Sequence, residues 1–247
     1  MKTKDFLLRL VVAAIVAFVP PSAEAEPAAK NDSHATTTPN AETWKRIMER
    51  DGSISLPKPP EKDEDLRRET FALLREAAAR TDEHIAAARA DAEENPMRIV
   101  AAILPDADGT TTPRLAIVLG AAELAERSIL DELKARFPRK RPFQVIDGFT
   151  SCVGGASGSY PSRHNAFAFL IAGLLSDLVP ERTEALRKRA VEYGNARLLC
   201  GAHWPSDVEA GRTVGQELAA RVAASPEWRS VRSELRNELI SAQSKKH

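Results

Sequence analysis

The amino-acid sequence predicts an all-α protein, a compact bundle of helices. From about Ala41 onward, nearly every segment repeats its apolar residues with a helical period, whereas patterns typical of strands are nearly absent. No internal repeat is found, which argues against a solenoid. The chain has 247 residues, 43% of them hydrophobic, so it can bury one large core. We therefore expect residues 41–247 to form a single domain.

The N-terminal 25 residues have the pattern of a secretory signal peptide. A cationic start precedes a short apolar run over residues 10–19, and small residues then end at Ala25, where cleavage is expected. The run is too short to span a bilayer, and an N-terminal membrane anchor is the alternative interpretation. Residues 26–40 are small, polar and proline-bearing, which predicts a flexible leader. The mature chain is thus expected to be periplasmic or secreted, with no membrane partner after signal removal.

Apolar periodicity marks the expected helices in chain order. The first lies in an alanine-rich stretch, and the second follows Pro113. The third is almost wholly apolar, so it is expected to be buried. Ser225 and Pro226 are typical N-cap and first-turn residues for the last helix. In order, the helical segments are 65–94, 115–133, 166–178, 181–199, 208–224 and 226–243.

The charge balance argues against nucleic acid as a specific partner, and the cysteine content predicts a disulfide. Lysine plus arginine equal aspartate plus glutamate at 35 each, so no overall field favours nucleic acid. The two cysteines, Cys152 and Cys200, both lie in the exported part, and an even pair in an oxidising compartment predicts a disulfide. Two unpaired buried thiols are the alternative. The oligomeric state is left open, and a homo-oligomer is compatible with the sequence.

Two short polar segments are candidates for chemistry. In "KARFPRKRP", Lys134 and Arg141 are separated by six residues, a spacing that also suits a solvated, basic helix end. In "YPSRHN", Ser162 and His164 precede the apolar helix over 166–178. That segment could be an ordinary helix start with a capping serine and a packed histidine. It could equally present a helix N-terminus to an anion.

The third segment, "NARLLCGAHWPSD", places Arg197, His203 and Asp207 close together in the chain. Arg197 shares a helical stripe with apolar residues, so it should face the interior, where a cation needs an anionic partner. An internal ion pair with Asp207 or Glu192 is one interpretation. A metal site made of both histidines and Asp207 is disfavoured, because no third histidine or cysteine has ligand spacing and the cations would repel a metal ion.

The three segments together suit a tetrahedral oxyanion. Cations and amide donors would hold its oxygens, since arginine forks match their geometry. A histidine whose other ring nitrogen is held by a carboxylate can be a nucleophile, as His203 and Asp207 would allow. His164 could then protonate the leaving alkoxide. No metal or other cofactor is needed for this chemistry, which requires positioning and charge neutralisation.

The order K-x6-R-P, P-S-x-H and R-x5-H-x3-D resembles the signature of the type 2 phosphatidic acid phosphatase superfamily, which includes vanadium haloperoxidases. Locally, "CGAHWPSDVEAGR" and the cysteine pair resemble class A bacterial non-specific acid phosphatases. The resemblance implies a helical bundle of this type and small-molecule phosphate esters as substrates. It also implies that His203 forms a phosphohistidine, Asp207 orients it and His164 is the general acid. The implied phosphate-binding residues are Lys134, Arg141, Ser162 and Arg197.

Two residues depart from the family pattern. Arg163 stands where glycine is usual, and Ala196 stands where serine is usual. Arg163 is predicted to add a fourth cation to the phosphate site, and the alternative is that it points away and narrows the pocket. A vanadate-dependent haloperoxidase and a non-catalytic phosphate-binding protein remain the alternative functions.

Overall fold

The computed structural model describes residues 38–52 and 54–244, and in this part every regular element is helical. The expected all-α class is confirmed. The predicted signal peptide and nearly all of the predicted leader lie outside the described residues. None of the described helices is both long enough and apolar enough to cross a membrane. The α-helices are α1 (Ala41–Glu49), α2 (Asp63–Ala78), α3 (Asp82–Ala90), α4 (Pro96–Ile103), α5 (Pro113–Arg136), α6 (Arg163–Leu178), α7 (Thr183–Leu199), α8 (Pro205–Ala224) and α9 (Pro226–Ser244).

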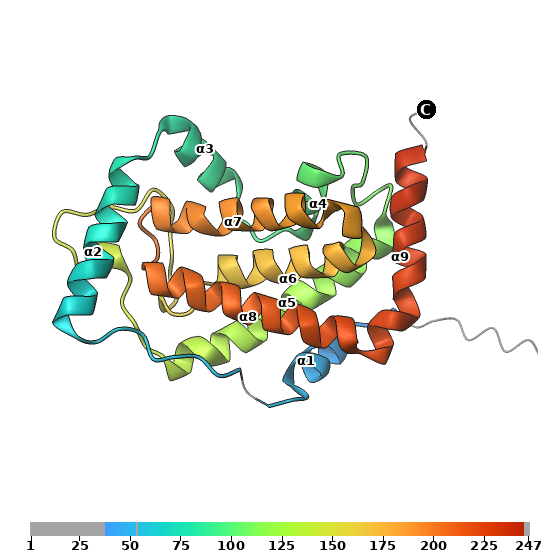
Figure 1. Cartoon of the computed structure of the whole chain (residues 1–247), viewed down its shortest axis with the longest axis horizontal. Coiled ribbons are helices and arrows are strands. Elements are labelled where there is room, and N and C mark those ends of the chain that lie inside the picture. Colours follow the sequence, from blue (N-terminus) through green and yellow to red (C-terminus); the bar gives the residue numbers. More distant parts are fainter. Residues whose placement is uncertain (1–37, 53, 245–247) are drawn as a thin grey trace, which may run out of the picture. The chain divides into compact units, whose positions relative to one another are not determined.

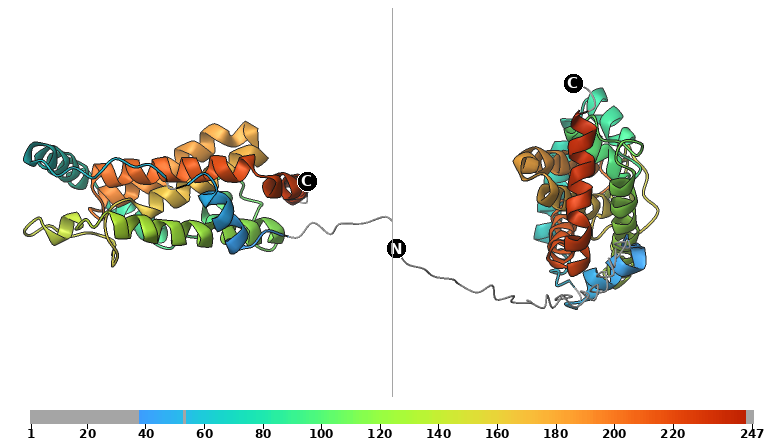
Figure 2. Two further views of the ribbon diagram at one scale, coloured as in Figure 1. Left: turned by 90° about the horizontal axis from the view of Figure 1, so that it is seen from below. Right: turned by 90° about the vertical axis from the view of Figure 1, so that its right-hand side faces the viewer.

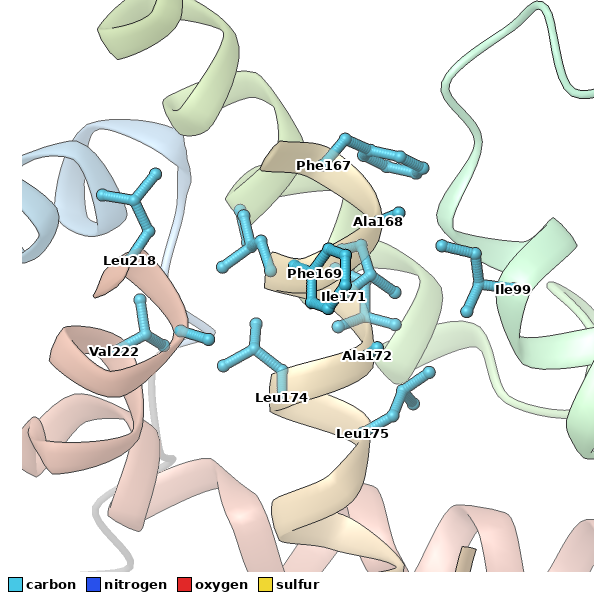
Figure 3. Close-up of a cluster of buried hydrophobic side chains, with 14 of the residues drawn as sticks. Ile99, Phe167, Ala168, Phe169, Ile171, Ala172, Leu174, Leu175, Leu218 and Val222 are labelled. Carbon is cyan, nitrogen blue, oxygen red and sulfur yellow. The ribbon is translucent and has the colours of Figure 1, made fainter. Parts of the chain in front are cut away.

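Helix α6 is the central element of the bundle. It packs most extensively against α7 and α8, and it also contacts α4, α5 and α9 (Figure 1). Most of its residues are buried, from Asn165 to Leu178, as expected from the apolar run in the sequence. Figure 3 shows its phenylalanine, isoleucine and leucine side chains meeting those of the surrounding helices. Burial on all sides makes α6 a fixed support for the polar residues at its N-terminus.

The remaining long helices enclose this centre. Helices α6, α7 and α8 form one layer, and α5 runs beneath it (Figure 2). Helix α1 contacts both α5 and α8. Helix α9 crosses the end of the bundle where α8 finishes, opposite the end where α6 and α8 begin (Figure 1). Ser225 caps α9 as expected, because its Oγ accepts a hydrogen bond from the amide of Trp228 at 3.1 Å.

The helices differ from the predicted segments in three places, the first of which is α1, a helix that was not among them. The alanine-rich stretch over 65–94 is divided into α2 and α3, because Thr81 starts a new helix by accepting a hydrogen bond from the amide of His84. Helix α4 was not predicted, and it begins at Pro96 after a capping Asn95.

Helices α6 and α8 approach each other closely at two glycines of α8. A Cβ placed on Gly211 would lie 2.2 Å from the carbonyl oxygen of Ser162, and one on Gly215 would lie 2.2 Å from that of Ala166. At the same end, the amide of Ser162 donates to the carbonyl oxygen of Asp207 at 2.9 Å. The first turns of α6 and α8, which carry two of the predicted motifs, are therefore held side by side.

Candidate active site

A cavity of about 510 Å³ lies at the end of the bundle where α6 and α8 begin. Its walls come from α5, the loop between α5 and α6, the first turn of α6, the last turn of α7, the loop between α7 and α8, and the segment between α3 and α4. Six residues predicted for the site line it together, although they span about seventy positions of sequence. They are Lys134, Arg141, Arg163, His164, Arg197 and His203.

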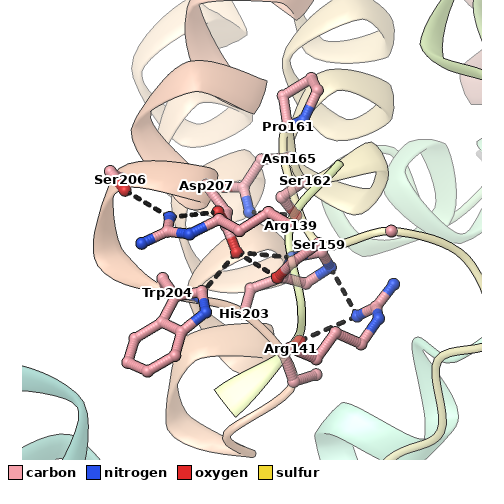
Figure 4. A network of polar contacts seen from close by, with 12 residues as sticks. Arg139, Arg141, Ser159, Pro161, Ser162, Asn165, His203, Trp204, Ser206 and Asp207 are labelled. Carbon is pink, nitrogen blue, oxygen red and sulfur yellow. Dashed lines mark hydrogen bonds and ion pairs between the residues drawn. The ribbon is translucent and has the colours of Figure 1, made fainter. Parts of the chain in front are cut away.

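His203 is held between a carboxylate and a guanidinium group. Its Nδ1 lies 3.3 Å from Oδ2 of Asp207, and its Nε2 lies 3.0 Å from Nη1 of Arg141 (Figure 4). These partners assign a proton to Nδ1 and a lone pair to Nε2. Burial lowers the pKa of His203 to about 3, and the charge of Arg141 acts in the same direction. The imidazole is therefore neutral at any ordinary pH, as a nucleophile must be.

Asp207 is fully buried in the first turn of α8 and accepts several hydrogen bonds. Its Oδ1 accepts from Nη1 of Arg139 at 2.7 Å, and its Oδ2 accepts from the amide of Trp204 at 2.8 Å and from Oγ of Ser159 (Figure 4). Burial raises the pKa of this carboxyl, but the contacts with His203 and Arg139 outweigh it and hold the pKa below its usual value. The carboxylate is thus fixed in position and charged.

His164 contacts a different carboxylate. Its Nδ1 lies 3.0 Å from Oε1 of Glu94, its Nε2 lies 3.0 Å from the carbonyl oxygen of Ala92, and its ring stacks on that of Tyr193. Burial lowers the pKa of His164 below its ordinary value, and Glu94 acts against that shift. Two acceptors facing the two ring nitrogens suit an imidazole that carries a proton on each.

Three buried cations are held by backbone carbonyl groups. Lys134 donates to the carbonyl oxygens of Gly158 and Pro161, each at 2.7 Å. Arg197 donates to that of Asp91 at 2.6 Å, and its Nε has no hydrogen-bond partner among the described residues. The carbonyl partners of Arg141 are Ser157 (3.0 Å) and Ala202 (2.8 Å).

Carbonyl oxygens orient these three cations without neutralising them, and no carboxylate in the described part of the chain forms an ion pair with any of them. Burial, together with the charges of Arg141 and Arg163, lowers the pKa of Lys134 to about 7. The interpretation of Arg197 as the partner of Asp207 or Glu192 does not hold, because its acceptor is a backbone oxygen. Buried positive charge without a counter-charge is unfavourable, so an anion in the cavity would stabilise this arrangement.

The remaining two predicted phosphate-binding residues differ in position: Arg163 lines the cavity, and Ser162 lies outside its lining. Arg163, the first residue of α6, lines the cavity and forms an ion pair with Asp131, and its Nε has no hydrogen-bond partner within residues 38–52 and 54–244. Ser162 is fully buried, and its Oγ accepts a hydrogen bond from Asn165 at 3.1 Å. It does not line the cavity. The expected disulfide joins Cys152 to Cys200 and so links the glycine-rich loop, residues 152–159, to the end of α7.

Several supporting residues were not predicted. Arg139 and Ser159 hold Asp207, while Asp91 and Glu94, between α3 and α4, hold Arg197 and His164. Arg139 lies in the basic segment already singled out, but its position gave no reason to prefer it to its neighbours. The acidic residues before Asn95 and Pro96 are typical of a helix start. The sequence therefore contains no separate indication that Asp91 and Glu94 contact the site.

Residues 114–230 match the PAP2 superfamily, and this range contains all the predicted site residues. The chain contains a PAP2 superfamily domain. The resemblance inferred from the three motifs is thereby confirmed. The supporting residues Asp91 and Glu94 lie upstream of the matched range, so part of the site comes from outside that range.

Curated proteins similar to this chain are named acid phosphatases. The "Non-specific acid phosphatase" of Salmonella typhimurium is 40% identical over 112 residues, covering 43% of this chain and 44% of that protein. The protein of the same name from Providencia stuartii is 34% identical over 125 residues, or 48% of each chain. The "Acid phosphatase" of Zymomonas mobilis is 31% identical over 141 residues, covering 55% of this chain and 53% of that protein. The chain thus spans about half the length of the relatives it matches.

A solved structure is also similar. It is a transmembrane PAP2 type phosphatidylglycerolphosphate phosphatase from Bacillus subtilis, 21% identical, and the match covers 62% of this chain and 91% of that one. The TM-score is 0.33, a likeness too slight to bear on the fold or function of this PAP2 domain.

Proposed function

We propose that this chain is an acid phosphatase that hydrolyses small-molecule phosphate monoesters through a phosphohistidine, without a metal ion. The observation that carries the proposal is the setting of His203, which is neutral, held by Asp207 and placed at a cavity whose buried cations have no carboxylate partner in the part of the chain that the structure describes. The PAP2 domain and the names of its relatives support the same activity. Export to the periplasm or the medium is part of the proposal.

The reaction would proceed in two steps. Lys134, Arg141 and Arg197 hold the phosphoryl oxygens, and Nε2 of His203 attacks phosphorus as the ester P–O bond breaks. The Nδ1 proton stays in the hydrogen bond to Asp207, whose charge stabilises the phosphorylated imidazole.

His164 gives its proton to the departing alkoxide, so that an alcohol leaves. His164 then takes a proton from water, and the resulting hydroxide attacks phosphorus. The P–N bond breaks, inorganic phosphate is released and His203 returns to its neutral form.

Arg163 and Ser162 complete the proposed phosphate site. Arg163 would add charge at the rim, where Asp131 holds part of its guanidinium group. Ser162, at the N-cap of α6, would act from behind the cavity by fixing the first turn, whose free amides would face a bound anion. The helix dipole adds positive potential at the same place.

The test is hydrolysis of an aryl phosphate by the chain from residue 26 onward, compared with His203→Ala. Removing the nucleophile is expected to lower kcat by about 10³-fold or more. His84→Ala, at an exposed histidine of α3, is the matched control and should keep full activity. Full activity in EDTA is expected as well, and inhibition by the chelator would contradict the proposed metal independence.

A labelled ester distinguishes the covalent mechanism from simple binding. Label that stays on the alkali-denatured wild-type protein, and is absent from His203→Ala, would support a phosphohistidine. Phosphate binding without turnover would instead indicate a non-catalytic binding protein. Peroxide-dependent halide oxidation after vanadate loading, with no phosphatase activity, would indicate a haloperoxidase.

A further inference from the structure

A second hollow adjoins the cavity, and the proposed reaction makes no use of it. Its volume is about 470 Å³, and it shares Gly154 and Gly155 with the cavity that contains His203. Two aromatic rings, those of Phe143 and Phe149, contribute to its lining. The other lining residues are Thr150, Ser151, Cys152 and Val153.

The two phenylalanines are fixed relative to the catalytic groups. Phe143 follows Arg141 by two residues, in the short 3₁₀ helix Pro142–Gln144. Phe149 packs on Gly201, where an added Cβ would lie 2.4 Å from a ring carbon. Gly201 comes directly after Cys200, whose disulfide partner Cys152 also lines the hollow. Both rings therefore lie on the segment between α5 and α6 that carries Arg141 and that the disulfide joins to the end of α7.

Only two glycines, which have no side chains, are shared between the hollow and the cavity. Gly154 and Gly155 form this boundary, and a Cβ on Gly154 would meet no atom of the described residues within 4 Å. A Cβ on Gly155 would lie 2.5 Å from Cζ of Arg141, so the guanidinium group lies directly beside this boundary. An ester whose phosphate contacts Arg141 can thus extend its alcohol portion across the two glycines.

We propose that this hollow binds the flat, apolar leaving group of an aromatic phosphate monoester. The inference rests on the proposed phosphatase activity and adds a substrate preference to it. Other parts of the cavity wall are charged, since they include Glu93, Glu94 and Arg127. The binding free energy of an aromatic ring is most favourable where its surface is removed from water by contact with other rings. The hollow lined by Phe143 and Phe149 offers such a surface.

The experiment compares kcat/KM for 1-naphthyl phosphate and for glycerol 2-phosphate in wild type, Phe149→Ala and Phe143→Ala. Each variant is expected to lose about tenfold on the naphthyl ester and less than about twofold on the glycerol ester. The inhibition constant of inorganic phosphate should not change, because the cations stay in place. Phe71→Ala, at an exposed phenylalanine of α2, is the matched control and should leave both esters unaffected.

Phe149→Leu serves if the alanine variant does not fold, because it keeps an apolar side chain on Gly201 and removes only the ring. It should lower the preference for the naphthyl ester by about threefold, a smaller loss than that of the alanine variant. Equal losses on both esters, or no loss on either, would overturn the subsite and leave the phosphatase proposal intact. Failure of the wild type to hydrolyse either ester would overturn both.

Discussion

The two imidazoles of the site differ in what surrounds them, and this difference assigns their roles. His203 is enclosed by protein and faces Arg141, so burial and positive charge both keep it neutral. His164 is stacked on Tyr193 and faces Glu94, which favours its protonated form against the effect of burial. One ring is thus prepared to attack phosphorus and the other to give up a proton, on the proposed mechanism.

The same environments predict a pH dependence. The pKa of His203 is about 3, so the nucleophile is lost only as the pH falls through that value. The pKa of His164 is below its ordinary value, and that of Lys134 is about 7, so the general acid and one cation are lost as the pH rises toward neutrality. We expect kcat/KM to be largest on the acidic side of pH 6.5, the ordinary value for histidine.

Glu94→Gln tests whether deprotonation of His164 causes the fall in kcat/KM at high pH, the alkaline limb of the profile. Glu94 raises the pKa of His164, so its removal should move the alkaline limb to lower pH and leave the acid limb in place. The phosphate of the ester also titrates near pH 6, so it contributes to the loss of kcat/KM at high pH in both proteins. The difference between the profiles of wild type and Glu94→Gln therefore reports on His164 more directly than either profile alone. Superimposable profiles of kcat/KM against pH would contradict the role given to His164.

Among the helices, the contact between α6 and α8 does most to shape the site. Because Gly211 and Gly215 have no Cβ, the backbones of α6 and α8 can come closer together than any other residue type would allow. This approach places the first turn of α6 beside that of α8, so that His164 and Arg163 share a cavity with His203. Glycine is required here by the close approach of another backbone, a need that a single sequence does not reveal.

Gly215→Ala is expected to destabilise the fold. Its Cβ would meet the carbonyl oxygen of Ala166 at 2.2 Å, and α6 is enclosed on all sides and cannot easily move. We expect a loss of about 3 kcal/mol in the free energy of unfolding, measured by urea denaturation.

Gly120→Ala is the matched control, because Gly120 lies within α5 and a Cβ there would meet nothing within 4 Å. It should stabilise the protein by about 0.5–1 kcal/mol, the usual gain from replacing glycine inside a helix. Equal effects of the two substitutions would show that the α6–α8 contact is looser than the structure indicates.

For the molecule as a whole, local patterns predicted most of the helices and the three motifs, and contacts between distant segments supplied the rest. The apolar run of α6 predicted its burial, and the stripe of Leu186, Ala190 and Tyr193 correctly predicted that Arg197 faces inward. The acceptor of Arg197 is the carbonyl oxygen of Asp91, 106 positions away. Every residue has such a carbonyl, so no side-chain pattern could have indicated this partner.

The disulfide provides the last prediction, because it joins parts of the molecule that no helix connects. Cys152 and Cys200 are 48 positions apart, and the loop they close contains all of α6 and α7. Replacing both by serine frees the unfolded chain, which on the chain-entropy model costs about 4 kcal/mol of stability. For a domain of this size that corresponds to a fall in Tm of roughly 8–16 °C.

The activity of the same double variant shows what the bond does for the site. At temperatures where the variant stays folded, the glycine-rich loop should move more freely beside Arg141, and KM for phosphate esters should rise more than kcat falls. Cys152→Ser alone should match the double variant, since either change breaks the bond. An unchanged Tm would indicate that hydrogen bonds such as that from the amide of Cys152 to the carbonyl oxygen of Cys200, at 3.0 Å, already hold the loop without the sulfur bridge.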